Sequence, residues 1–157
     1  MSFTDELARK PGAHDFYAVL RRLERNGKPK PLIGESGSAR DDIVKVGQDP
    51  FLPFPDSNLS GAATGRYGQQ NIKVKFLGFF GPQGPLPLAI TEEFYGYSLS
   101  PDSRTRRHES FPRFLDLLSN RFVQLFFRGW ASARPIVHAD RPESDRFQDY
   151  VGSQIGI

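Results

Sequence analysis

The chain has 157 residues, the length of one ordinary domain or of part of a larger protein. It contains no cysteine, which excludes a disulfide scaffold and every thiolate metal site. Its net charge of +3 comes from 21 basic and 18 acidic residues that are interspersed along most of the chain, whereas a nucleic-acid-binding domain usually has a strong local basic excess. Fifteen glycines and 13 prolines predict long turns, and 14 phenylalanines supply much of the area available for a core.

The N-terminal ten residues are polar and of mixed charge, unlike a secretion signal. No segment approaches the roughly 18 consecutive apolar residues that a membrane span needs. The lack of cysteine fits a reducing compartment. We therefore expect a soluble protein that, in a bacterium, is cytoplasmic.

The first predicted helix covers residues 15–25. Its apolar residues recur at the spacing of one helical face, and they are Phe16, Val19, Leu20 and Leu23. Asp15 suits the N-cap position, and Asn26-Gly27 predicts a left-handed end to the helix.

Loops and two short strands are predicted between residues 28 and 76. Residues 42–47 form a strand that Pro50 prevents from continuing. Residues 57–70 are polar and rich in glycine, which predicts a mobile loop. Residues 71–76 alternate between apolar side chains and lysines, the pattern of a strand with one buried face.

A turn rich in glycine and proline follows at residues 78–87. It comes after a strand, as a phosphate-binding loop does, but it lacks the Lys-Ser/Thr ending, and its prolines lack amide donors. We therefore favour a rigid turn that presents Phe79 and Phe80. Residues 87–95 predict a short helix that frays at Gly96.

Residues 111–130 give the strongest helical signal. One stripe holds Leu115, Leu118, Phe122, Leu125, Phe126 and Gly129, and Phe114, Leu117 and Phe127 widen it. A helix that is apolar around most of its circumference is normally buried on more than one side. This loop-rich chain has little material to cover it, which predicts a partner protein.

The residues after the long helix predict short helical segments, followed by an apolar C-terminal stretch without a clear element. Arg134-Pro135 ends the long helix, and residues 140–150 form a turn of helix with Asp140 as its N-cap and Pro142 in its first turn. Residues 151–157 are apolar and interrupted by glycine, which suggests an interrupted fold.

Catalytic and metal-binding patterns are weak. The three histidines, His14, His108 and His138, show no metal-ligand spacing, so we expect no metal and no cofactor. Ser36 lies in a segment like a nucleophile elbow, but Ser38 replaces the second glycine and no clear strand precedes it. A hydrolase that uses Ser36 predicts an activity that Ser36→Ala abolishes, and we expect no such activity.

A basic cluster at Arg104–His108 leaves a second function class open. It is compatible with contacts to phosphates, and therefore with a nucleic-acid-binding module whose affinity falls steeply with salt. The simpler interpretation is a solvated loop in which Asp102 and Glu109 balance the charge.

Several motifs together resemble one family. They are Asp15-Phe16-Tyr17, Leu20–Glu24, Pro31–Gly34, Val46–Pro50, Phe54-Pro55, Phe76–Leu88, Thr91-Glu92, Arg113–Arg121, Leu125–Trp130, Asp140-Arg141-Pro142, Asp145-Arg146-Phe147 and Gly152. In this order they resemble TssG (also called ImpH or VasB), a baseplate subunit of the bacterial type VI secretion system. Asn120 and Gly129 depart from the residues more usual there, His and Ala. The resemblance covers residues 1–157 as the N-terminal half of the family, which implies a chain cut before the C-terminal half.

The resemblance implies a structural adaptor without enzymatic activity. TssG-like proteins join a pair of TssF subunits into a wedge and connect the wedge to TssK, around the tail-tube hub of a contractile injection machine. We expect an α+β fold with two main helices, a few short antiparallel strands and long Gly/Pro-rich connections. The partner-binding residues that we expect are Phe79, Phe80, Phe122, Phe126 and Trp130, and ordinary packing within the chain is the competing role for each.

Overall fold

The computed structural model describes residues 2–99 and 110–156. This part of the chain contains six α-helices and a three-stranded sheet, which confirms the predicted α+β class. The helices are α1 (Phe3–Arg9), α2 (Phe16–Asn26), α3 (Leu88–Leu99), α4 (Ser110–Ser132), α5 (Pro135–Ala139) and α6 (Arg146–Gln154). The strands are β1 (Val44–Gln48), β2 (Leu59–Thr64) and β3 (Gln70–Val74). The basic cluster at residues 104–108 lies outside the described residues.

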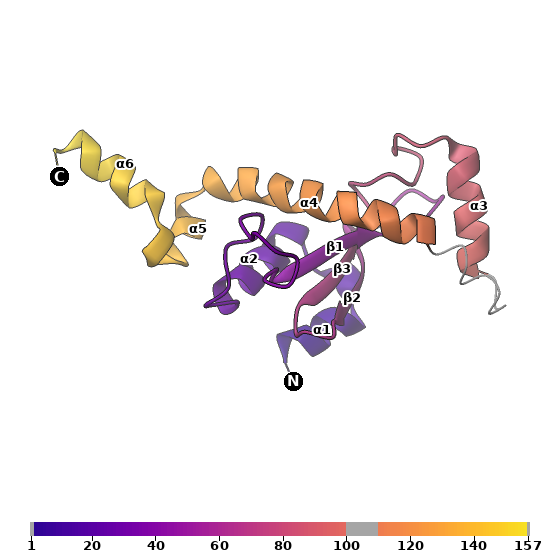
Figure 1. The fold of residues 1–157 in the computed structure, drawn as a ribbon, viewed down its shortest axis with the longest axis horizontal. Helices are drawn as coiled ribbons and strands as arrows, with labels where there is room; N and C mark the ends of the chain where they lie inside the picture. Colours follow the sequence, from indigo (N-terminus) through magenta and orange to yellow (C-terminus); the bar gives the residue numbers. More distant parts are fainter. Residues whose placement is uncertain (1, 100–109, 157) are drawn as a thin grey trace.

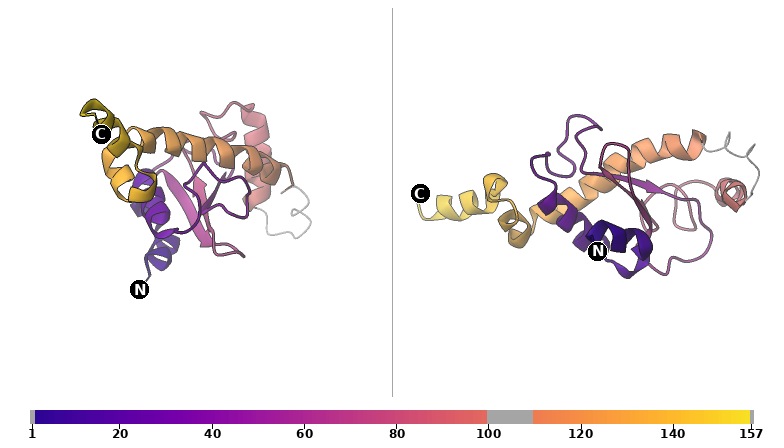
Figure 2. Two further views of the ribbon diagram at one scale, coloured as in Figure 1. Left: turned by 60° about the vertical axis from the view of Figure 1, so that its left-hand side comes forward. Right: turned by 90° about the horizontal axis from the view of Figure 1, so that it is seen from below.

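The molecule is elongated along α4, as Figure 1 shows. The sheet and the N-terminal helices lie on one side of α4, with α3 beside its first turns and α5 and α6 beyond its last turn. The two views of Figure 2 show the same arrangement, with α6 extending away from the body of the molecule. The core lies between the sheet, α2 and the sheet-facing side of α4, and its largest fully buried side chains are Phe16 and Phe127.

The sheet is mixed, and the prediction of antiparallel strands is wrong for one of its two pairings. The spatial order is β1-β3-β2, with β3 in the centre. β2 and β3 form an antiparallel hairpin, but β1 runs parallel to β3, with Val46 opposite Ile72. A parallel neighbour requires a crossover connection, and the chain makes it through β2. β1 therefore lies at an edge, where its outer backbone groups need partners from elsewhere.

Strand β2 occupies a segment that the sequence predicts to be a loop. Residues 59–64 read Leu-Ser-Gly-Ala-Ala-Thr, with a single large apolar side chain, so no alternating pattern is visible. Pairing with β3 and packing of α1 over β2 stabilise the strand. Tertiary contacts here override weak local propensity.

The predicted C-terminal end of α2 is wrong in detail, whereas its predicted N-cap is correct. Gly27 has a φ of −83°, so α2 has no left-handed end. A Cβ at Gly27 would lie 2.7 Å from Cδ1 of Ile43, so close packing explains the glycine. Asp15 caps α2 as predicted, through a 3.0 Å hydrogen bond from the Ala18 amide.

The C-terminal helices also differ from the prediction in their caps. Asp140 ends α5 and binds Arg21 instead of starting a helix, with Nε and Oδ2 at 2.5 Å. The N-cap of α6 is Asp145, which accepts hydrogen bonds from the Phe147 and Gln148 amides. α3 continues through Gly96 to Leu99 instead of fraying there.

A candidate protein-binding surface along helix α4

One side of α4 packs against the sheet through side chains that are four residues apart. These buried residues are Leu115, Ser119, Val123, Phe127 and Ala131. Rows four residues apart form one ridge of a helix surface, and this ridge seals the core. Only Leu115 and Phe127 belong to the apolar residues that the sequence singles out. The remaining apolar residues of the stripe therefore lie on other sides of the helix.

A ladder of polar side chains fixes how α4 is rotated against the sheet. Asp116 accepts a hydrogen bond from the Gln48 amide at 2.8 Å, Asn120 accepts one from the Val46 amide at 2.8 Å, and Gln124 donates to the Val44 carbonyl at 2.9 Å.

The spacing of this ladder matches the outer edge of β1. Four helical residues rise ~6 Å and two strand residues rise ~6.6 Å, so consecutive rungs meet alternate residues of β1. The ladder thus provides hydrogen-bond partners for the outer backbone groups of β1. The sequence alone did not reveal this role of Asp116, Asn120 and Gln124.

The C-terminal half of α4 is held by a buried charge cluster. Glu24 of α2 pairs with Arg128 and accepts a 2.7 Å hydrogen bond from the Ile33 amide. Arg141 donates to the Glu24 carbonyl at 2.7 Å and to the Lys30 carbonyl at 2.8 Å. Burial raises the pKa of the Glu24 carboxyl, against the opposing effect of Arg128 and the Ile33 amide. The cluster ties α2, α4 and the segment after α5 into one unit.

The opposite side of α4 is apolar and open. Six large side chains lie there with 43–72% of their surface exposed, namely Phe114, Leu117, Leu118, Phe122, Leu125 and Phe126. Since a large side chain offers roughly 150–250 Å², the six together leave on the order of 500 Å² of apolar surface in water. A continuous apolar patch of this size typically marks a protein interaction site.

Aromatic packing closes one border of this open face. Trp130 is half-buried and stacks on Tyr17, with ring centroids 4.5 Å apart. Phe126 lies 6.1 Å from Tyr17 and 6.0 Å from Phe76. The Arg134 guanidinium lies over the Trp130 ring, 4.9 Å from its centroid. Trp130 therefore joins the open face to the core, whereas Phe122 has 62% of its surface in water.

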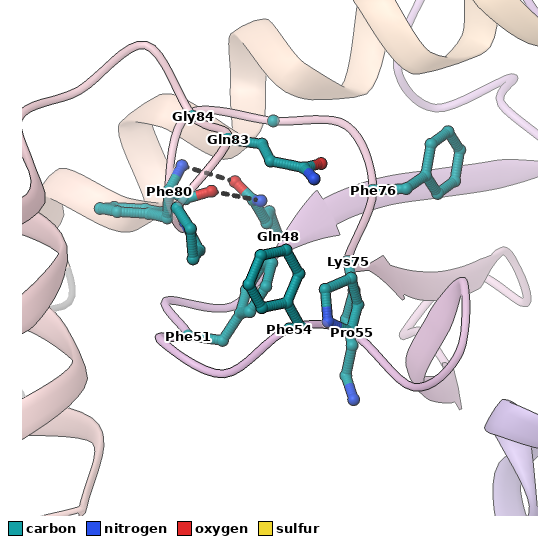
Figure 3. Close-up of a pocket in the computed structure, with 11 residues that line it drawn as sticks. Gln48, Phe51, Phe54, Pro55, Lys75, Phe76, Phe80, Gln83 and Gly84 are labelled. Carbon is teal, nitrogen blue, oxygen red and sulfur yellow. Dashed lines mark hydrogen bonds between the residues drawn. The ribbon is translucent and has the colours of Figure 1, made fainter.

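The turn at residues 78–87 places its two phenylalanines differently from the prediction. Phe80 is 3% exposed, so the expectation that the turn presents its ring is wrong. The Gln48 amide binds both backbone groups of Phe80, accepting from N at 2.8 Å and donating to O at 2.9 Å (Figure 3). Gly81, with a φ of +98°, allows the sharp turn that follows. Phe79 is half-buried at the surface.

A small pocket lies beside this turn. Figure 3 shows aromatic rings from the segment after β1 facing the turn. The lining includes Phe51, Phe54, Phe76 and Phe80, together with Lys75 and Gln83. Lys75 is engaged by Asp56 at 2.8 Å, and the Gln48 amide is used by Phe80, so these two polar groups of the lining already have partners within the chain.

Within residues 2–99 and 110–156, the other candidate sites are occupied by local contacts. Ser36 donates to Asp42, the ring of His14 packs against Phe3, and His138 lies near the Ser132 carbonyl and Asp145. No group of three His, Cys, Asp or Glu side chains in these residues is arranged to hold a metal ion. None of the described helices has the length and apolar character to cross a membrane.

Comparison with known families identifies the chain. The family model described as "Type VI secretion, TssG" matches residues 10–157. The chain therefore belongs to the TssG family, a component of the type VI secretion baseplate, which confirms the resemblance seen in the sequence. Neither the curated proteins nor the solved structures include a match to this chain.

Proposed function

We propose that this TssG-family chain is a structural adaptor of the baseplate wedge and that it binds TssF-like subunits through the open face of α4. The wedge would in turn connect to TssK at the cytoplasmic side of the secretion machine. The role involves no catalysis and no cofactor. The observation that carries the proposal is the row of six large apolar side chains along a helix whose orientation is fixed by hydrogen bonds and buried charges.

Rigidity of the helix supports an interface role. The polar ladder to β1 and the Glu24–Arg128 pair hold α4 in one rotation, so its apolar side chains are presented without further ordering of the backbone. Such preorganisation lowers the entropic cost of binding. Aromatic side chains in the centre of an apolar patch are typical binding hot spots. Phe122 lies within this patch, and Phe126 and Trp130 lie at its aromatic border beside Tyr17.

The open face supplies about two thirds of the ~800 Å² that each partner contributes to a standard interface. The turn at residues 78–87 offers a second contact through Phe79, whose neighbour Phe80 anchors the turn from inside. A TssF-like subunit that contacts both surfaces would reach the usual interface size.

Replacing Phe122 by alanine tests the proposal. The ring is mostly in water, so the free energy of unfolding should change by less than about 0.5 kcal/mol. Binding to the TssF-like subunit of the same system should weaken by about 2 kcal/mol or more, roughly thirtyfold in Kd. Light scattering on a sizing column shows the complex, and calorimetry gives the Kd.

The matched control is Tyr67→Ala in the β2–β3 turn. Tyr67 is 64% exposed and is also aromatic, but it does not lie on α4, so binding should be unchanged. The proposal is wrong if Phe122→Ala and Tyr67→Ala bind the subunit equally well. Phe127→Ala is a control for the core. Its ring is fully buried, so this substitution should lower the free energy of unfolding by about 3–5 kcal/mol.

A further inference from the structure

We infer that the open face of α4 receives an amphipathic partner helix that carries acidic residues along one flank and approaches most closely at Gly129. The inference rests on the proposed function, because it specifies the kind of partner segment that the same face binds. Three observations carry it, namely the spacing of the apolar side chains, the open glycine and the charges that remain on α4.

The apolar side chains of the open face follow the spacing of a helix seam. Phe114, Leu118, Phe122, Leu125 and Gly129 follow one another at steps of four, four, three and four residues. Steps of three and four residues are typical of the contact line between two packed helices. From Phe114 to Gly129 the seam extends ~22 Å, about four helical turns. This length fits a single partner helix of about four turns.

Gly129 lies at the end of this seam, in an exposed position within α4. Glycine is among the least favourable residues in a helix interior. No described atom lies within 4 Å of the position that a Cβ would take, so packing inside the chain does not require a glycine there. Close approach of a second backbone is a physical reason for a glycine at such a site.

Among the described residues, the basic side chain of Arg121 lies on the open side of α4. Asp116 is turned toward the sheet, where it binds the Gln48 amide and Lys73. Arg128 is paired with Glu24. Arg121 is exposed and has no hydrogen bond or ion pair among the described residues. A partner helix with Glu or Asp beside its apolar stripe would complement this charge, as flanking charges do in coiled coils.

Two synthetic helical peptides test the charge requirement. They share one leucine seam and differ only in glutamate or lysine flanks, and fluorescence anisotropy measures their Kd for the chain. We expect the glutamate peptide to bind about tenfold more tightly at low salt, and Arg121→Glu to reverse the preference. Arg25→Glu makes the same charge change at an exposed position of α2 and should leave the preference intact. Equal binding of both peptides, or tighter binding of the lysine peptide, would overturn the inference.

A leucine at position 129 tests the close approach. Gly129→Leu and Gly96→Leu add the same side chain at open helical positions, one on the seam and one in α3. Both variants should keep the circular dichroism spectrum and melting temperature of the parent or melt slightly higher. We expect Gly129→Leu to bind the TssF-like subunit about tenfold more weakly and Gly96→Leu to bind normally.

The outcomes separate this inference from the proposed function. If Phe122→Ala loses binding while Arg121→Glu and Gly129→Leu bind like the parent, the face is a docking surface and the inference is wrong. If the glutamate peptide binds with the expected preference but the TssF-like subunit does not, the chemistry of the face is supported and the proposed partner is wrong.

Discussion

Replacing Gln124 by methionine removes the amide that joins α4 to the edge of the sheet and nearly preserves the volume of the side chain. Gln124 is 1% exposed and donates to the Val44 carbonyl at 2.9 Å and to Asn120 at 3.3 Å. Val44 is fully buried, so water has no access to replace the lost donor. The substitution therefore creates an unsatisfied carbonyl in the core with little change in packing.

The expected loss of stability follows from that carbonyl. A buried polar group without its partner costs about 1–3 kcal/mol. For a chain of this length, each kcal/mol lowers the melting temperature by about 2–4 °C, so Gln124→Met should melt roughly 2–12 °C below the parent. The amides of Val46 and Gln48 should also exchange faster with solvent deuterium, because the neighbouring rungs of the ladder lose support.

Thermal unfolding followed by circular dichroism and hydrogen exchange by mass spectrometry measure these two effects. Arg121→Met on the same helix is the control, since its side chain is exposed and has no hydrogen bond or ion pair with the described residues, and it should change stability by less than about 0.5 kcal/mol. If Gln124→Met melts with the parent and its β1 amides stay protected, the ladder does not hold α4 on the sheet and the reasoning is refuted.

Two further predictions concern the Asp116 end of the ladder. A Cβ at Gly47 would lie 2.6 Å from the Asp116 carboxylate, so Gly47→Ala should destabilise by about 1–3 kcal/mol in urea unfolding, whereas Gly61→Ala, with its nearest neighbour at 3.8 Å, should cost clearly less. Burial lowers the pKa of Lys73, but Asp116 and Asp49 outweigh it and raise that pKa above the ordinary 10.5. The stabilisation by this charge is therefore complete below pH 10.5 and is lost at higher pH as the folded protein releases the proton. The difference in unfolding free energy between the parent and Lys73→Met should be constant from about pH 6 to about pH 9 and shrink above pH 10.5. A difference that stays constant above pH 10.5 would contradict the raised pKa of Lys73.

The sequence predicted helices α2 and α4 because their patterns are strong and local. Asp15 and the apolar residues that follow it define α2, and the apolar run from Phe111 to Trp130 defines most of α4. The strand at β3 was equally visible, since Ile72 and Val74 alternate with lysines. β2 was missed because small residues give no alternation, and its pairing partner lies outside any local window.

The candidate surface was predicted only in part. An apolar excess in residues 111–130 indicated a partner, and Phe122 and Phe126 do lie on the open face. Phe80 could not be placed, because its burial depends on the Gln48 amide 32 residues earlier in the chain. Leu117 and Leu118 belong to the predicted apolar stripe but were not among the expected partner-binding residues, since a helix with apolar residues around most of its circumference does not reveal which of them face its own sheet.

Composition and motif order by themselves determined the α+β class, the principal helices and membership of the TssG family. Only the tertiary structure decided which side of α4 is open. The reason is that the rotation of the helix depends on polar groups, because Asp116, Asn120 and Gln124 must meet the unpaired edge of β1 at matching intervals. Burial of apolar side chains alone would allow α4 to turn any of several sides toward the sheet. The hydrogen bonds to the edge of β1 can form in only one rotation of the helix, and in that rotation Phe122 and its neighbours are exposed to water.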